Sequence, residues 1–359
     1  MPLSVTLLGH YPPPFGGVAS LMRQMEVALR SSGCSVCIMN LGHGKPDAAN
    51  VTNFSTTNRF REVLELRTAI AASGSDVLHY VTASYRSFWL ASVCLMLASL
   101  SGKSMVVSFV GGAFPDFING LGPAKRWWAR TVLRRAAALI PCNDEIAEVV
   151  EELVPEKGTT QITNSFPVTT SKGSALPVEV EAFVSSRGPV VCSTGAAARE
   201  YGLLDAVAAV DRLRGSHPNL GFVLVLTRYG TDEYEERLQS EIEARGLSNT
   251  ILVARNLPDF VALLERSDVF LRSTLVDGDS MSVRESLYLG VPAVASDTAF
   301  RPDGTIVFRK GDDEDMAVKL ETALERGRGD STGAREESER NLETLLGVYR
   351  SVTRRAAGS

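Results

Sequence analysis

The feature that most constrains this chain is a regular alternation of short apolar runs with longer amphipathic stretches, which occurs in two series. Strands that alternate with helices in this way are typical of parallel sheets covered by helices on both faces. The first series covers residues 4–163 and the second covers residues 189–325. Between them, residues 167–187 lose clear periodicity and begin with a stretch rich in Ser, Thr, Pro and Lys, which favours a linker. The pattern therefore predicts two α/β domains.

The length of the chain agrees with this division, because 359 residues exceed what a single hydrophobic core usually organises. We predict an N-terminal domain at residues 1–170, a second domain at 171–335, and a last amphipathic helix at 336–359 that crosses back to the first domain. The Gly-containing stretch 327–333 is predicted to be a hinge. In open α/β sheets, ligands bind outside the carboxyl ends of the strands, so we expect the site in a cleft at these ends.

Composition narrows the class of protein. A net charge of −5 argues against a nucleic-acid binder, which needs clustered positive charge. The first residues lack the basic start and long apolar run of a secretory signal, and the longest apolar stretch (88–100) is shorter than the roughly 20 residues that cross a bilayer. Five scattered cysteines fit a reducing compartment. We therefore expect a cytoplasmic protein, with an additional peripheral position at the inner face of the membrane left open.

The most informative segment lies in the second series, where a buried strand leads through a polar loop containing Asp277 into a helix. Ser280 or Ser282 can cap that helix. The amides of Ser280, Met281 and Ser282 would then point at whatever occupies the loop, and a helix N-terminus favours a diphosphate there. Glu285, one turn into the helix, is placed to accept hydrogen bonds from a ribose diol.

This segment resembles the signature of glycosyltransferase family 4, whose members are retaining enzymes with the GT-B fold. The hallmark of the family is two glutamates separated by seven residues and followed by a turn of the Gly-x-Pro-Val-Val type. Asp277 and Glu285 have that separation, with Asp in the first place, and Gly290-Val-Pro292 follows. The resemblance implies two Rossmann-like domains that face each other across a cleft. It also implies that Glu285 holds the nucleotide ribose, while Asp277 and the amides after Gly278 contact the donor sugar.

The resemblance extends into the first series. Gly16 and Gly17 are similar to the glycine loop of the family, which lies close to the donor phosphates and needs bare backbone. For the acceptor we single out four residues that follow or lie on strands of this half, namely His10, His79, Gly111 and Gly112.

Two departures from the family pattern affect the expected chemistry. The Arg and Lys that usually grip the diphosphate are missing from residues 195–202, where alanine and tyrosine stand in their places. Arg199 is our first candidate to replace them, and Arg228 and Arg272 are the next. Val110 takes the place of a His that is common at the end of the fourth strand. We therefore expect catalysis to rest on Asp277, Glu285 and Arg199.

These observations predict a retaining, hexosyltransferase-type glycosyltransferase of polysaccharide or glycoconjugate biosynthesis. It would move a sugar from a nucleotide-sugar co-substrate to a glycan or lipid-linked acceptor, with no other cofactor and no metal. The spacing Asp277-Gly-Asp279 also matches an Asp-x-Asp metal motif, but its place inside the two-carboxylate signature favours a metal-independent site. Two alternatives stay open, a GT-B-like sugar-nucleotide epimerase and a catalytically degenerate protein that binds a nucleotide sugar.

Residues 123–135 form the strongest local charge feature, a basic helix that includes Trp127 and Trp128. Such a helix can rest on an anionic membrane surface. The alternative is a helix whose tryptophans pack inward and whose cations are only solvated.

Overall fold

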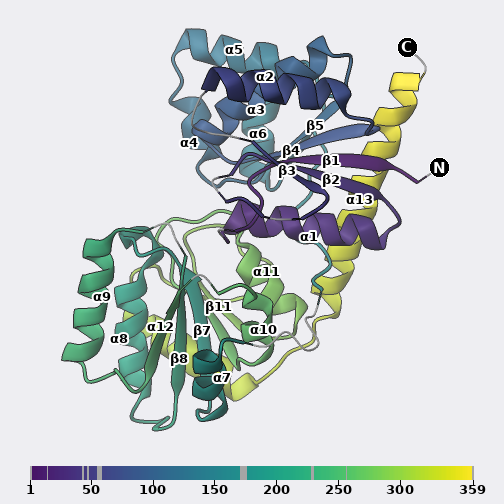
Figure 1. Cartoon of the computed structure of the whole chain (residues 1–359). Helices are drawn as coiled ribbons and strands as arrows, with labels where there is room; N and C mark the ends of the chain where they lie inside the picture. The colour runs from purple at the N-terminus through teal and green to yellow at the C-terminus, as the bar shows by residue number, and fades with distance from the viewer. Residues whose placement is uncertain are drawn as a thin grey trace. The chain divides into compact units, whose positions relative to one another are not determined.

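The computed structural model of this chain describes residues 2–13, 15–42, 44–46, 48–54, 59–169, 176–227, 230–255 and 257–357. The chain divides into two compact units (Figure 1). The N-terminal unit comprises Met1–Pro167 together with Glu337–Ser359, and the C-terminal unit comprises Val168–Glu336.

The N-terminal unit contains a parallel sheet with the strand order β3-β2-β1-β4-β5-β6. Its strands are β1 (Ser4–Gly9), β2 (Ser35–Asn40), β3 (Val51–Asn53), β4 (Val77–Thr82), β5 (Met105–Phe109) and β6 (Ala138–Pro141). Its helices are α1 (Gly17–Ser31), α2 (Arg59–Ala72), α3 (Arg86–Leu100), α4 (Phe114–Asn119), α5 (Pro123–Leu133), α6 (Asp144–Leu153) and most of α13 (Thr332–Ala357). The strand order reverses between β1 and β4, so the loops after these two strands diverge at one edge of the sheet.

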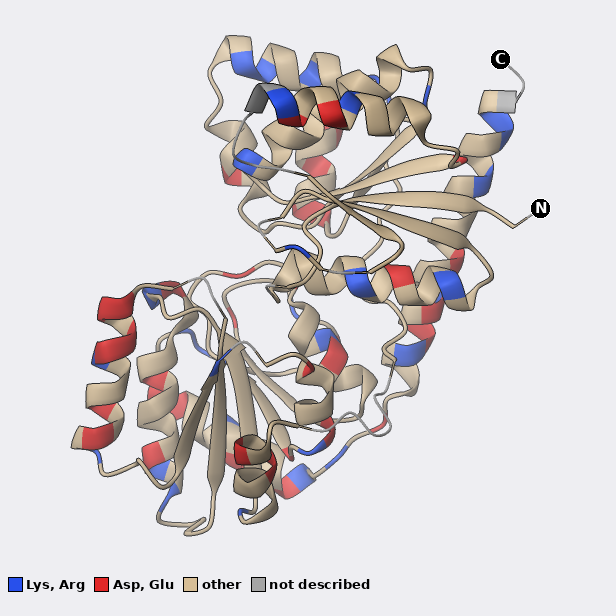
Figure 2. Ribbon diagram, in the orientation of Figure 1, with Lys and Arg blue, Asp and Glu red and all other residues tan. Residues whose placement is uncertain are grey.

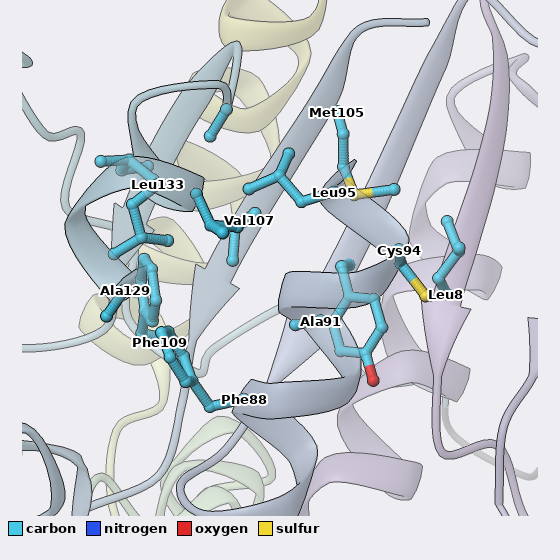
Figure 3. Packing of buried hydrophobic residues seen from close by; sticks show 14 of the residues in the cluster. Leu8, Phe88, Ala91, Cys94, Leu95, Met105, Val107, Phe109, Ala129 and Leu133 are labelled. Carbon is cyan, nitrogen blue, oxygen red and sulfur yellow. The ribbon is translucent and has the colours of Figure 1, made fainter. Parts of the chain in front are cut away.

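The core of this unit forms where the apolar helix α3 packs against the sheet (Figure 3). Phe88 and Leu95 of α3 belong to one buried cluster with Leu8 of β1 and Phe109 of β5. Each of these side chains is at most 2% exposed, and burying one contributes roughly 1.5–3 kcal/mol. Because α3 is apolar on all sides, it is covered by other helices as well as by the sheet.

The C-terminal unit repeats the arrangement, with the strand order β12-β11-β10-β7-β8-β9 in a second parallel sheet. Its strands are β7 (Val190–Gly195), β8 (Gly221–Leu226), β9 (Ile251–Arg255), β10 (Val269–Arg272), β11 (Ala293–Ser296) and β12 (Ile306–Phe308). Its helices are α7 (Val178–Ser185), the 3-10 turn η1 (Arg199–Tyr201), α8 (Leu203–Leu213), α9 (Asp232–Ala244), α10 (Phe260–Glu265), α11 (Met281–Tyr288) and α12 (Asp313–Arg326). The point where the order reverses lies between β7 and β10. The predicted α/β class with two parallel sheets is confirmed.

Some local predictions are wrong or incomplete. Helix α7 lies inside the stretch that we interpreted as a linker, because it buries only Val180 and Val184 and so leaves a weak periodic signal. The sequence pattern also missed α2, α4 and the three-residue strands β3 and β12. Helix α13 begins at Thr332 and includes the end of the predicted hinge.

No helix among the described residues combines the length and the hydropathy that are needed to span a bilayer.

Candidate functional site

In the C-terminal unit, two loops meet at the carboxyl ends of the neighbouring strands β7 and β10. Ser273 Oγ donates to the carbonyl oxygen of Tyr201 at 2.8 Å, and the Leu275 amide donates to that of Glu200 at 2.7 Å. Gly202 has φ +59°, and a Cβ added there would lie 2.1 Å from the Ser273 carbonyl oxygen. Only glycine permits this approach. The loop at residues 196–202 is therefore fastened to the loop at residues 273–280.

Asp277 lies at the centre of a buried ionic cluster. Its carboxylate accepts two hydrogen bonds from Arg272, through Nε and Nη2 at 3.0 Å each, and one from Arg301 Nη1 at 2.9 Å. Thr274 Oγ1 adds a bond at 3.0 Å, and the Asp277 side chain is only 8% exposed. Burial alone would raise the pKa of Asp277, but the charges and hydrogen bonds of the two arginines hold that pKa well below its usual range. Asp277 is therefore a fixed carboxylate.

Arg301 is a candidate site residue that our sequence analysis missed. Besides Asp277, its guanidinium contacts Ser296, donating from Nε to the carbonyl oxygen at 2.8 Å and from Nη2 to Oγ at 3.2 Å. The signal was its position a few residues after β11, because the carboxyl ends of adjacent parallel strands share one edge of the sheet.

Helix α11 begins beside this cluster. Its N-cap residue is Ser280, whose Oγ lies 3.2 Å from Ser282 Oγ; within the described residues the Ser280 hydroxyl caps no amide of the first turn. Asp279 pairs with Arg284 at 2.5 Å, and both side chains are buried. The Ser280 side chain therefore does not bond the amides of the first turn, which include those of Met281 and Ser282. These amides lie at the positive end of the helix dipole.

Glu285 lies one turn into α11 and is also buried. Burial raises the pKa of its carboxyl to about 8, and the nearby negative charge of Asp259 contributes in the same direction. Asp259 itself caps α10 by accepting from the Ala262 amide at 3.1 Å. At pH 7 the ligand-free protein therefore holds Glu285 mainly as a neutral carboxyl, which can both donate and accept a hydrogen bond.

The three arginine candidates have different positions. Arg199 is exposed in η1, directly after β7, and its side chain has no hydrogen bond or ion pair with any described residue. Arg272 is half-buried, bonded to Asp277 and 5.5 Å from the ring centroid of Tyr201. Arg228 lies outside the described residues. Gly278 stays close to Asp277, whose Oδ1 accepts from the Gly278 amide at 3.1 Å.

In the N-terminal unit, the glycine loop follows β1 at the carboxyl edge of the sheet. Gly16 is the N-cap of α1 and Gly17 its first residue, and a Cβ on Gly17 would meet no described atom within 4 Å. The start of the loop is held by Asn40, whose Oδ1 accepts from the Tyr11 amide at 3.0 Å. His10, directly before Tyr11, is half-buried.

The structure corrects the prediction for His79. This side chain is completely buried, with Nδ1 2.5 Å from the Tyr349 hydroxyl and Nε2 2.8 Å from Ser108 Oγ. Burial lowers the pKa of His79 to about 3, so the ring is neutral. Because both nitrogens are bonded inside the unit, His79 is not available to an acceptor. Its role is to fasten α13 to the sheet.

Gly111 and Gly112 begin the loop after β5. A Cβ on Gly111 would lie 3.1 Å from Ala83 Cα, so this glycine lets the loop pack against the one after β4. Gly112 is exposed. Tyr85, in the loop after β4, has φ +54°, unusual for a residue other than glycine, and is 58% exposed. Its unusual backbone is visible only in the structure.

The orientation of the tryptophans in α5 tests one of the two interpretations of residues 123–135. Trp127 is 65% exposed and Trp128 is 39% exposed, so the interpretation that both rings pack inward is wrong. The helix instead buries Ala129, Val132 and Leu133.

Residues 180–336 match the family model described as glycosyl transferases group 1. No curated protein matches the chain. Among solved structures, Anabaena HepE in complex with UDP-glucose is similar with a TM-score of 0.71 and 14% identity, over 99% of this chain and 100% of that one. A glycosyltransferase from Rickettsia africae has a TM-score of 0.70 and 14% identity, with 98% of each chain covered.

A third similar structure is a UDP-forming α,α-trehalose-phosphate synthase from Burkholderia xenovorans, with a TM-score of 0.68, 13% identity and coverage of 99% and 100%. At these identities the likeness establishes the fold, and the predicted glycosyltransferase resemblance is confirmed at the level of group 1. Residues 180–336 thus match glycosyl transferases group 1, and the chain has the GT-B fold.

Proposed function

We propose that this protein is a retaining glycosyltransferase of the hexosyltransferase type that takes its sugar from a nucleotide-sugar donor. The observation that carries the proposal is the connection between β10 and α11, where a helix N-terminus that Ser280 does not cap, the fixed carboxylate of Asp277 and the buried Glu285 lie together. Negative charge is favoured at such a helix end, and a diphosphate is the natural occupant. The glycosyl transferases group 1 match over the same residues supports this assignment.

In this proposal the amides of Ser280, Met281 and Ser282 receive the diphosphate. Arg199 is exposed in the adjoining loop and supplies a cation that is not already paired with Asp277. Glu285 holds the ribose diol. Its high pKa suits this task, because a neutral carboxyl donates to one hydroxyl while accepting from the other.

Asp277, Gly278 and Arg272 complete the donor side. Two arginines, Thr274 and the Gly278 amide already donate to the Asp277 carboxylate, so in this proposal a sugar hydroxyl replaces one of these donors. Gly16 and Gly17 leave bare backbone for the phosphates, and Arg228 is kept as a further candidate. Anabaena HepE, which has a similar structure, was solved with UDP and with UDP-glucose, which makes UDP-sugars the first donors to test.

The transfer itself breaks the bond between the anomeric carbon and the diphosphate oxygen and forms a bond from that carbon to an acceptor hydroxyl oxygen. The proton of this hydroxyl passes to the departing phosphate oxygen on the same face, so configuration is retained and no separate base is needed. Fixed amides and Arg199 stabilise the charge that develops on the diphosphate. No step of this proposal uses a metal, and Asp277 and Asp279 each pair with arginine.

On the acceptor side we propose a glycan or lipid-linked sugar, bound at the carboxyl edge of the N-terminal sheet by His10, Gly111 and Gly112. Peripheral contact of residues 123–135 with an anionic membrane belongs to the same proposal, since Trp127 and Trp128 face outward. Polysaccharide or glycoconjugate assembly is the process that such an acceptor implies.

The test is a thermal-shift panel of nucleoside diphosphates and nucleotide sugars on the wild type, on Glu285→Ala and on Glu325→Ala, an exposed glutamate of α12 that serves as the control. A ligand at about a hundred times its Kd adds roughly 2.7 kcal/mol. We expect one nucleotide to stabilise the wild type and the control but not Glu285→Ala. Stabilisation of all three alike would overturn the role of Glu285.

Analysis of the products distinguishes the proposed transferase from the epimerase and from the degenerate binding protein. Release of nucleoside diphosphate with transfer to an added glycan, and with the anomeric configuration kept, is the expected result. Conversion of the donor sugar without an acceptor would indicate the epimerase, and binding without turnover would indicate the degenerate binding protein. An inverted product would contradict the retaining mechanism.

A further inference from the structure

The N-terminal unit contains a pocket of about 630 Å³ that lies away from the loops described above. It opens beside Ala138, the first residue of β6, and is therefore at the amino edge of the sheet. The loops that follow β1, β4 and β5 are at the carboxyl edge, so the pocket takes no part in the proposed transfer.

The charged side chains that line this pocket are mainly basic. Arg134, Lys157 and Arg355 contribute cations from the end of α5, the turn after α6 and the end of α13, and Glu156 is the lining carboxylate. Glu156 accepts hydrogen bonds from both Arg134 and Arg130, so one negative charge is shared between two guanidinium groups. An excess of positive charge therefore remains in the pocket.

The excess of positive charge affects the ammonium group of Lys157. Its Nζ donates to the carbonyl oxygen of Ala136, and burial together with the charge of Arg355 lowers the pKa of its ammonium group. Like charges that are held together in a partly desolvated pocket favour a bound anion. Gly158 adds bare backbone to the lining, and a Cβ there would meet no described atom within 4 Å.

The surface next to the pocket indicates which class of anion the pocket binds. Trp127 precedes Arg134 by seven residues, which places both on one face of α5, about 10 Å apart along the helix axis. Figure 2 shows Lys and Arg along α5 and at the C-terminal end of α13. Exposed indole rings beside cations are typical of the headgroup layer of a membrane, whereas a free phosphate needs no exposed tryptophan.

We propose that this pocket binds the phosphate of an anionic phospholipid headgroup while Trp127 and Trp128 enter the interfacial layer beside it. The inference rests on the membrane contact in the proposed function and adds a defined site outside residues 123–135, formed by Lys157 and Arg355. It is independent of the donor site and of transferase activity.

The experiment measures binding of the full chain to phosphatidylcholine vesicles with and without phosphatidylglycerol at low salt, by co-sedimentation and by the blue shift of tryptophan fluorescence. The pocket variants are Lys157→Gln, which can still donate to Ala136, and Arg355→Gln. Arg67→Gln removes one exposed cation of α2 and is the matched control. Circular dichroism and unfolding midpoints establish that each variant is folded.

We expect binding only to vesicles that contain phosphatidylglycerol, and about five-fold weaker binding for each pocket variant, equivalent to the ~1 kcal/mol that one cation contributes at an anionic surface. Arg67→Gln should bind like the wild type. Equal weakening of all three variants would overturn the pocket while leaving the membrane contact of α5 intact.

A second arm uses inorganic phosphate. If phosphate stabilises the wild type but not the pocket variants, and vesicles do not bind, then the site is a free-phosphate site and the lipid assignment is wrong. If neither probe binds, both the pocket and the membrane contact are overturned, and the donor-binding test above is unaffected.

Discussion

The two sheets have the same strand order, and the connection from β4 to α3 in the N-terminal unit occupies the place of the connection from β10 to α11 in the C-terminal unit. The first is three residues long (83–85), and the second is eight residues long (273–280). The short connection contains only neutral residues, whereas the long one places a carboxylate between two buried arginines. The same sheet topology therefore accommodates either a neutral or a charged loop after its fourth strand, depending on the residues of that loop.

The difference also extends to the buried titratable groups nearby. His79 on β4 is a neutral base bonded at both nitrogens, and it joins two elements of its unit. Glu285 on α11 is an acid whose pKa is raised toward 8 beside an open helix end. The first arrangement suits a structural group, and the second is consistent with the ligand-binding role that we propose for Glu285.

The largest loss of stability should follow from removing the carboxylate of the Asp277 ionic cluster. Asp277→Ala leaves the guanidinium groups of Arg272 and Arg301 buried without their carboxylate, and removing one partner of a buried pair costs about 3–5 kcal/mol. Urea unfolding measures this loss. Asp303→Ala, an exposed aspartate near Arg301, should change stability by less than about 0.5 kcal/mol. Similar small losses for both variants would contradict the cluster.

A smaller loss of stability should follow from removing the hydrogen bond between Tyr349 and His79. Tyr349→Phe removes the hydroxyl that lies 2.5 Å from His79 Nδ1, and an unsatisfied buried nitrogen costs about 1–3 kcal/mol. Tyr288→Phe, at a tyrosine that is only partly buried, serves as the control and should be nearly neutral. Donor binding should be unchanged in Tyr349→Phe; its loss there would show that the contact serves the site rather than the fold.

A pH dependence of stability is also expected, and its sign should be opposite in the two units. The folded-state pKa of Glu285 is raised from 4.5 to about 8, so the folded protein holds more protons than the unfolded one between these values. Its contribution to stability therefore falls as pH rises, by at most about 1.4 kcal/mol per pH unit. His79, lowered from 6.5 to about 3, contributes stability that is lost as pH falls through this range.

The contribution of Glu285 to this pH dependence is measured from the unfolding midpoints of the wild type and Glu285→Gln at pH values from about 5 to 8. This range of roughly three pH units lies between the unfolded-state and folded-state pKa values of Glu285. The variant should lose the part of the decline that Glu285 causes. Identical slopes in both proteins would mean that Glu285 is not a buried neutral acid.

The comparison also explains how far sequence reasoning reaches. Strands such as β4 and β8, which are buried throughout, produce strong apolar runs, so the two sheets could be predicted. The glycosyltransferase resemblance placed Asp277 and Glu285 in one segment because both lie within a single loop and helix. Elements with few buried positions, such as α7, leave too weak a pattern to be recognised.

Contacts between distant segments could not be predicted in the same way. Arg301 reaches Asp277 from the loop after β11, and Tyr349 reaches His79 across 270 positions of the chain. The position of Arg301 after β11 was the one available sign, and nothing in the local pattern distinguishes Tyr349 from another helix tyrosine. His79 was assigned to an acceptor for this reason, since an isolated histidine in a strand does not reveal its partners.

The most direct test of the account is a crystal structure of the protein with UDP or a UDP-sugar bound. We predict the diphosphate within hydrogen-bonding distance of the Met281 and Ser282 amides, and the ribose on Glu285. A nucleotide found elsewhere in the C-terminal unit, with the N-terminus of α11 unoccupied, would contradict the central claim that the β10–α11 connection is the donor site.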